Sequence, residues 1–150
     1  VRFDAACALA QLGDRRGRAE LETHLGAEAT AWEATCALEQ LGDDLASTAL
    51  AAALSDRRTP AEAKLRAAAA ILRLPARADE VALARRLLLE GLRLRKLPLR
   101  GLAVQLLAET GGAWAVPALR ELAGLRAGRE LGEEIGEARA ARAPASDEAG

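Results

Sequence analysis

One pattern of about fourteen residues recurs four times along the chain, and this recurrence limits the possible folds more than any other feature. Its first two copies read VRFDAACALAQLGD over residues 1–14 and TAWEATCALEQLGD over residues 30–43. The third and fourth copies begin at Ala63 and Leu99, so successive copies start 29, 33 and 36 residues apart. Repeats of this length are typical of stacked helix pairs, because each pair buries its apolar face only against its neighbours.

The apolar residues of each copy have the spacing of one face of an α-helix. In the first copy they follow the i, i+3, i+4, i+7 pattern: Ala5, Ala8, Leu9 and Leu12. Three copies are followed by a glycine, at Gly13, Gly42 and Gly111, where we expect a left-handed residue to end the helix. We expect the aspartates after Gly13 and Gly42 to cap the next turn or helix. A second helix is predicted in each unit, because leucines recur at equivalent positions: Leu21, Leu50, Leu83 and Leu119.

Composition supports an all-α fold. Hydrophobic residues make up 51% of the chain, but aromatic residues only 2%. Alanine, leucine, arginine and glutamate, which are good helix formers, dominate. The third unit departs from the pattern, with Pro75 in place of the glycine and a longer second helix. Pro60 and Pro117 fall where proline is tolerated, near the start of a helix.

The segments 2–14 and 111–119 resemble bacterial HEAT repeats, in particular the short repeats of phycobilisome lyases. The resemblance covers about residues 1–125. It implies an α-solenoid, a right-handed superhelix of antiparallel helix pairs, with units at about 1–28, 30–58, 60–95 and 97–126. In this family the second helices line a concave face that binds proteins, and here that face would draw on residues around 16–25, 45–54, 78–90 and 114–123.

Beyond the fourth unit, an amphipathic pattern predicts a capping helix over residues 128–142, with its apolar stripe formed by Leu131, Ile135 and Ala138. The repeat domain would then span residues 1–142, and residues 143–150 would form a disordered tail. The chain begins at Val1, without an initiator methionine or a signal-peptide pattern. We therefore expect it to be part of a longer, cytoplasmic protein whose preceding repeats are missing here.

Residues for catalysis or metal binding are few. The chain has one histidine, His24, no tyrosine and three serines, so the usual catalytic sets cannot be assembled. His24 suits the end of a helix, and a zinc site would need further ligands at suitable spacing. Cys7 and Cys36 occupy equivalent positions, which predicts core packing rather than a disulfide. The carboxylates of Asp43 and Asp44 are interpreted as solvated caps. We predict no enzyme activity, no cofactor and no metal.

A basic segment stands out in a chain whose net charge is only −1. It contains Arg85, Arg86, Arg93, Arg95, Lys96 and Arg100, interrupted by the single acid Glu90. One interpretation is that the long arginine side chains cover neighbouring leucines. The other is a docking patch for an acidic protein segment, a phosphorylated peptide or nucleic acid. Nucleic acid is the weaker candidate, because no aromatic residues interleave the charges.

The two tryptophans have different expected roles. Trp32 aligns with Phe3 and Leu65, so we interpret it as a packing residue. Trp114 lies where a second helix begins, and it is either an exposed partner anchor or a filler of a local gap. The leading hypothesis is a non-catalytic scaffold that binds a protein partner, away from membranes. Alternatives are an accessory subunit resembling bilin lyases, or a nucleic-acid-binding module that uses residues 85–100.

Overall fold

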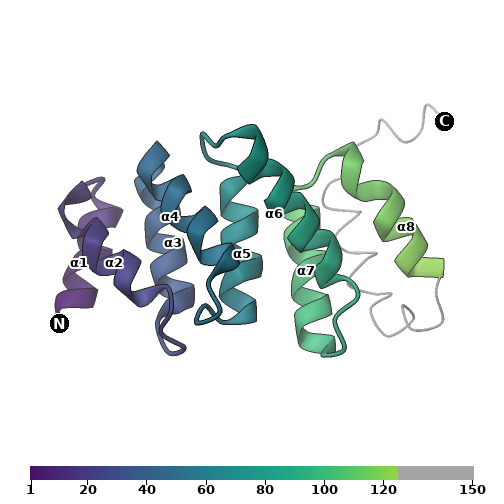
Figure 1. Ribbon diagram of the computed structural model, residues 1–150, viewed down its shortest axis with the longest axis horizontal. Coiled ribbons are helices and arrows are strands. Elements are labelled where there is room, and N and C mark those ends of the chain that lie inside the picture. Colours follow the sequence, from purple (N-terminus) through teal and green to yellow (C-terminus); the bar gives the residue numbers. More distant parts are fainter. Residues whose placement is uncertain (125–150) are drawn as a thin grey trace. The chain divides into compact units, whose positions relative to one another are not determined.

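A computed structural model describes residues 1–124, and this part of the chain is entirely helical (Figure 1). Its elements, in chain order, are α1 (Arg2–Gln11), the 3-10 helix η1 (Arg15–Gly17), α2 (Arg18–His24), α3 (Ala31–Leu41), α4 (Asp44–Ser55), α5 (Ala61–Ile71), α6 (Ala78–Gly91), α7 (Leu97–Thr110), the 3-10 helix η2 (Ala113–Ala115) and α8 (Val116–Gly124). Residues 1–124 contain no strand. The all-α prediction is confirmed, and the predicted capping helix at 128–142 and tail at 143–150 lie outside the described residues.

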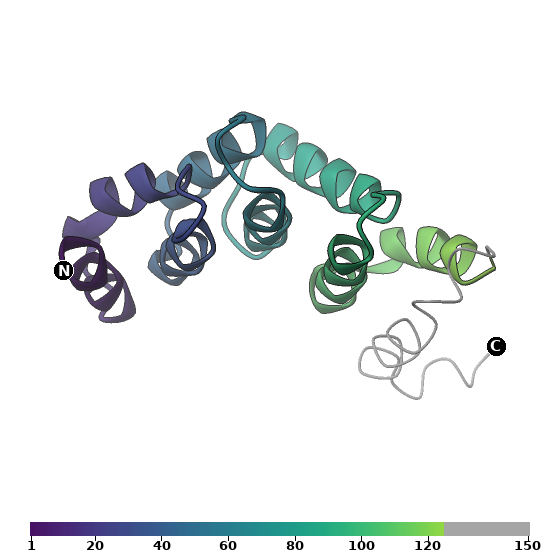
Figure 2. The same ribbon diagram turned by 90° about the horizontal axis from the view of Figure 1, so that it is seen from below.

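The chain divides into two compact units, Val1–Leu87 and the residues from Leu88 on. In the first unit α1, α3 and α5 stand side by side, and α2 and α4 form a second layer against them (Figures 1 and 2). The first helix of each later pair contacts both helices of the pair before it: α3 packs on α1 and α2, and α5 packs on α3 and α4. This packing is consistent with a helical repeat.

In the second unit, η2 packs against α8. The helix α7 buries a continuous set of small and branched apolar residues: Gly101, Ala103, Val104, Leu106, Leu107 and Ala108. Pro98 lies in its first turn, where the missing amide donor would have no partner within the helix. Pro117 is the second residue of α8, in agreement with the prediction.

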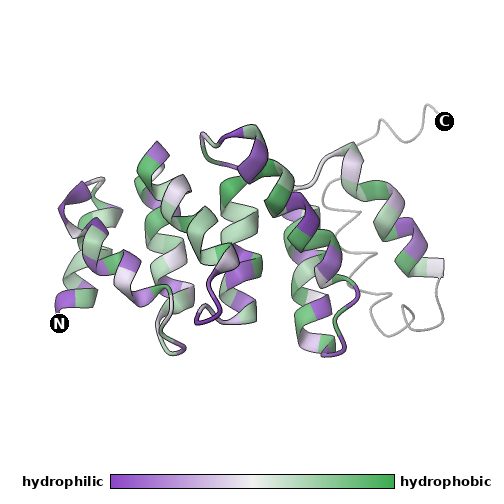
Figure 3. Cartoon of the chain, in the orientation of Figure 1, coloured by the Kyte–Doolittle hydropathy of each residue, from purple (hydrophilic) through white to green (hydrophobic). Residues whose placement is uncertain are grey.

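The predicted apolar face is buried in the second and third copies, as in Ala34, Ala37 and Leu38 of α3. Apolar residues dominate α3 and α4 (Figure 3). In the first copy the same face is largely exposed: Ala5, Ala8 and Leu12 are exposed and Leu9 is half-buried. Here Ala6 and Ala10 are the buried residues. Among the described elements, α1 packs mainly on η1, α2 and α3, and the side that carries Ala5, Ala8 and Leu12 stays exposed.

Two of the three predicted helix-ending glycines adopt the left-handed conformation. Gly13 has φ +76° and Gly42 has φ +66°. The prediction is wrong for Gly111, whose φ of −74° and ψ of 150° are extended. Its amide donates to the carbonyl of Leu107 at 2.7 Å. Glycine is needed there for close approach, because a Cβ would lie 2.8 Å from the Cβ of Ala115.

The connection between α5 and α6 runs over residues 72–77, whereas residues 42–43 suffice between α3 and α4. The carbonyl of Pro75 accepts a hydrogen bond from the buried Ser47 hydroxyl of α4 at 2.8 Å, which fixes this longer turn. The extra residues shift the register of α6. Ala84 and Leu88 are buried, while Leu83 is only half-buried. The predicted equivalence of Leu83 with Leu21 and Leu50 is therefore wrong by one residue.

Candidate binding surfaces

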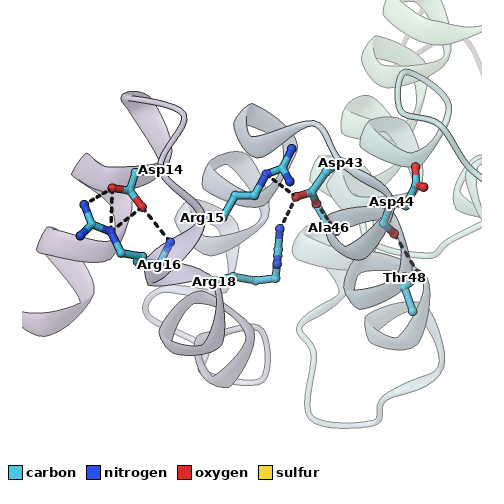
Figure 4. Close-up of polar contacts among 8 residues, drawn as sticks. All are labelled: Asp14, Arg15, Arg16, Arg18, Asp43, Asp44, Ala46 and Thr48. Carbon is cyan, nitrogen blue, oxygen red and sulfur yellow. Dashed lines mark hydrogen bonds and ion pairs between the residues drawn. The ribbon is translucent and has the colours of Figure 1, made fainter.

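A buried ion-pair cluster joins the first helix pair to the second, centred on Asp43 (Figure 4). The Asp43 Oδ1 atom accepts a hydrogen bond from the amide of Ala46 at 2.8 Å and so caps α4. Its Oδ2 atom pairs with Arg18 and, at 3.2 Å, with Arg15. The Asp43 and Arg18 side chains are only 14% and 16% exposed. The predicted cap is confirmed, but Asp43 is half-buried and paired rather than solvated.

Asp14, the equivalent of Asp43 in the first copy, binds within its own turn (Figure 4). It caps η1 by accepting the amide of Arg16 at 2.9 Å, and the Arg16 guanidinium pairs with its carboxylate. These hydrogen bonds from Arg16 lower the pKa of Asp14 to about 2. The same residue therefore closes a local turn in one copy and joins two helix pairs in the next.

A second charged cluster joins α3 to α5. Glu39 of α3 pairs with Arg66 of α5 and, at 3.0 Å, with Arg73 just beyond it. Glu39 and Arg66 are 14% and 15% exposed, so this pair is largely removed from solvent. Because a buried charge is costly unless it is paired, these groups hold adjacent helices in place and are poorly suited to bind a partner.

A groove of about 480 Å³ lies between the carboxyl-terminal ends of α2 and α4. Its lining includes the small residues Gly26, Ala27, Ala49, Ala52 and Ala53. Glu22, Asp56 and Arg58 supply its charges. Several of the lining residues fall within the segments 16–25 and 45–54, which were predicted to contribute to a binding face. The sequence alone did not indicate the groove, because alanines occur both in its lining and in the core.

The charges around the groove favour a cation. Arg58 donates to Asp56 through its amide at 2.9 Å and through its guanidinium at 3.0 Å, and these bonds lower the pKa of Asp56. Asp56 is therefore ionised at neutral pH, and Glu22 supplies a second carboxylate to the groove. The carboxyl-terminal ends of α2 and α4 add partial negative charge. With one guanidinium against two carboxylates, the groove is negative on balance.

The predicted partner-binding residues fall into two groups. Arg85 and Arg86 are exposed on α6 and belong to the first unit. The others belong to the second unit: Arg93, Arg95 and Lys96 are exposed between α6 and α7, Arg100 is half-buried in α7, and Trp114 is half-buried in η2. Their role in binding stays a prediction. Trp32, predicted to pack, is 40% exposed.

The histidine and the cysteines take part in local packing. His24 stacks on Phe3 with ring centroids 4.2 Å apart, and its Nδ1 atom lies 2.8 Å from the Thr30 hydroxyl. This contact joins the end of α2 to α1 and to the start of α3. Cys7 and Cys36 are free and half-buried, and burial is the main cause that raises the pKa of the Cys7 thiol. Within residues 1–124 no three His, Cys, Asp or Glu side chains gather in a way that could hold a metal ion.

Comparison with known proteins adds no family to this description. No family model, curated protein or solved structure matches the chain. The resemblance to HEAT repeats therefore stays a prediction that rests on the residues of the four copies. In the described part of the chain, none of the helices combines the length and the apolar character needed to cross a membrane.

Proposed function

We propose that the chain is a non-catalytic protein–protein interaction scaffold of the HEAT-repeat type, a right-handed stack of antiparallel helix pairs. The observation that carries this proposal is the repeated packing in the first unit, in which α3 contacts α1 and α2 and α5 contacts α3 and α4. A stack of this kind leaves its second helices available for contact with other molecules. In this chain those helices border an open groove.

The groove between α2 and α4 is the proposed binding site in the first unit. We infer that it binds a protein segment carrying a lysine or arginine side chain. The floor of alanines and Gly26 leaves room for an aliphatic stem, while Glu22 and Asp56 supply carboxylates for the cationic end. Long basic side chains combine an apolar stem with a charged head, so they match a groove of this composition.

Crosslinking followed by binding measurements tests this site. A photoreactive amino acid is placed at the groove residue Ala52 or, as a control, at the exposed Glu62 of α5. We expect a protein to be captured from position 52 only. The purified partner is then titrated by calorimetry against Ala52→Trp and Glu22→Lys, both at exposed positions, and we expect at least about tenfold weaker binding. Unchanged affinity for both folded variants would contradict the proposal.

In the second unit, Arg93, Arg95 and Lys96 form a second candidate surface, because all three are exposed in the connection between α6 and α7. Their charge suits an acidic protein segment. Charge reversal of the three residues would abolish binding of such a partner. A titration with DNA at increasing salt separates the nucleic-acid alternative, since phosphate contacts give a steep loss of affinity with salt.

A further inference from the structure

One carboxylate of the groove between α2 and α4 already binds a cationic side chain of the protein itself. The Arg58 guanidinium donates two hydrogen bonds to Asp56, from Nε to Oδ1 at 3.3 Å and from Nη2 to Oδ2 at 3.0 Å. Both residues line the groove. A ligand that brings a cationic side chain to Asp56 must therefore compete with Arg58.

The Arg58 side chain connects the two sides of the groove. Arg58 follows the end of α4, whereas Gly26 follows the end of α2. A Cβ atom on Gly26 would lie 3.2 Å from the Cβ of Arg58 and 3.7 Å from its Nε atom. The stem of Arg58 therefore packs against the turn after α2 while its guanidinium binds Asp56. Arg58 thus brings to the groove an aliphatic stem and a cationic head, the two parts that we infer for the ligand.

The Asp56 carboxylate keeps its position when the Arg58 guanidinium leaves. The backbone amide of Arg58 donates to Asp56 Oδ1 at 2.9 Å, and this bond does not depend on the arginine side chain. The Asp56 side chain is 31% exposed, so a ligand can reach it, and the Arg58 side chain is 81% exposed, so it can move into solvent. Because exposed ion pairs contribute little to stability, exchanging one guanidinium for another costs little.

An identical Asp-Arg-Arg turn shows which part of this arrangement is local structure. In residues 14–16 the amide and the guanidinium of the second arginine also bind the aspartate. None of these three residues lines the groove. The turn is therefore a local structure that needs no ligand. Two features distinguish the turn after α4: Asp56 lines a groove, and Arg58 packs against Gly26 on its other side.

We propose that the groove selects an arginine side chain over lysine, and that Arg58 occupies the arginine position until a ligand replaces it. This inference rests on the function proposed for the groove. A ligand guanidinium can form the same two bonds to Asp56, because its donors are arranged as a planar fork. A lysine ammonium is a point charge and cannot reproduce this pairing. Arg58 binds Asp56 and leaves Glu22, the second carboxylate, to the ligand, which favours the exchange.

Two peptides of equal charge test the selectivity: an acetylated and amidated Gly-Arg-Gly, and the same peptide with lysine in place of arginine. The isotope-labelled full chain is titrated with each peptide by NMR, and the amide shifts of Gly26 and Ala27 report binding to the groove. We expect the arginine peptide to bind at least about threefold more tightly. The Nε–H resonance of Arg58 should shift as the arginine peptide saturates the groove, because Nε loses its acceptor on Asp56.

Arg58→Ala and Arg57→Ala form a matched pair of variants. Each removes the charge of one exposed arginine, but of the two only Arg58 binds Asp56 and lines the groove. We expect Arg58→Ala to bind the arginine peptide about two- to fivefold more tightly than the parent chain, because no guanidinium has to be displaced. Arg57→Ala should change the affinity by less than about 1.5-fold, since solvent and salt screen its charge. Asp56→Asn removes the carboxylate charge, and we expect at least about fivefold weaker binding.

Three results would overturn the proposal and leave the function proposed for the groove standing. One is equal affinity of the parent chain for the arginine and lysine peptides. Another is an equal gain from Arg58→Ala and Arg57→Ala, since loss of charge alone would then explain the tighter binding. The third is an Arg58 Nε–H resonance that does not shift at saturation. If neither peptide binds the parent chain or any variant, the function proposed for the groove is itself refuted, and this inference with it.

Discussion

Replacing Asp43 with alanine tests how the first two helix pairs are joined. The substitution removes the cap of α4, a change that costs about 1 kcal/mol of the free energy of unfolding. It also leaves the guanidinium of Arg18, only 16% exposed, without its carboxylate. Loss of a hydrogen-bonded charge partner in such a place costs about 1.5–3 kcal/mol. We therefore expect a total loss of about 2.5–4 kcal/mol.

Urea unfolding followed by circular dichroism measures this loss. Asp43→Asn separates the capping contribution from the charge-pairing contribution, because asparagine caps a helix as well as aspartate does but has no charge. We expect the loss of stability in this variant to be intermediate. Asp14→Ala is the matched control: the same residue at the equivalent position of the first copy, paired with the exposed Arg16. We expect a smaller loss there. Equal losses for Asp43→Ala and Asp14→Ala would refute the argument that burial of the Arg18 pair matters.

Three further outcomes are expected from single residues. Leu38→Ala removes a fully buried side chain and should cost about 2–5 kcal/mol by urea unfolding, whereas Leu12→Ala, at an 83% exposed position, should change the free energy of unfolding by less than about 0.5 kcal/mol. Carboxyl NMR should place the pKa of Asp14 at about 2, and Arg16→Ala should raise this pKa toward about 3.9. Because the pKa is lowered in the folded state, the ionised carboxylate stabilises the fold above about pH 4, and this stabilisation is lost as the pH falls toward 2. Ser47→Ala removes the hydrogen bond to the turn before α6 and should cost about 1 kcal/mol in the same unfolding assay.

The helices and their order could be predicted because the signals for them are local. Spacing of alanine and leucine marks each helix, and Gly13 and Gly42 mark two of the ends. Gly111 shows the limit of this inference. It also follows a helix, but its backbone is not left-handed; an added Cβ would lie 2.4 Å from the Leu107 carbonyl oxygen and 2.8 Å from the Ala115 Cβ. A glycine in the sequence can meet either a need for a left-handed backbone or a need for close contact, and only the packing distinguishes the two.

The exposed side of α1 and the register of α6 could not be predicted for a different reason. A periodic pattern shows which residues share a helix face, but not whether another helix covers that face. Ala8 and Ala37 have nearly identical local sequences and opposite exposure. In the third unit, residues 72–77 form a longer connection before α6, and the buried position is Ala84 rather than Leu83.

Residues that recur between the copies and residues that differ between them have different places in this molecule. In the second copy, recurring residues such as Ala34, Ala37 and Leu38 are buried on the first helix of the pair. The groove lining includes second-helix residues that do not recur: Glu22 and Thr23 of α2 correspond, 29 positions later, to alanines in α4. Packing positions must repeat for the pairs to stack, whereas groove positions are free to vary. Under the proposed function, binding specificity would come from the residues that differ between the copies, and the repeated residues that indicate the fold would carry little information about the partner.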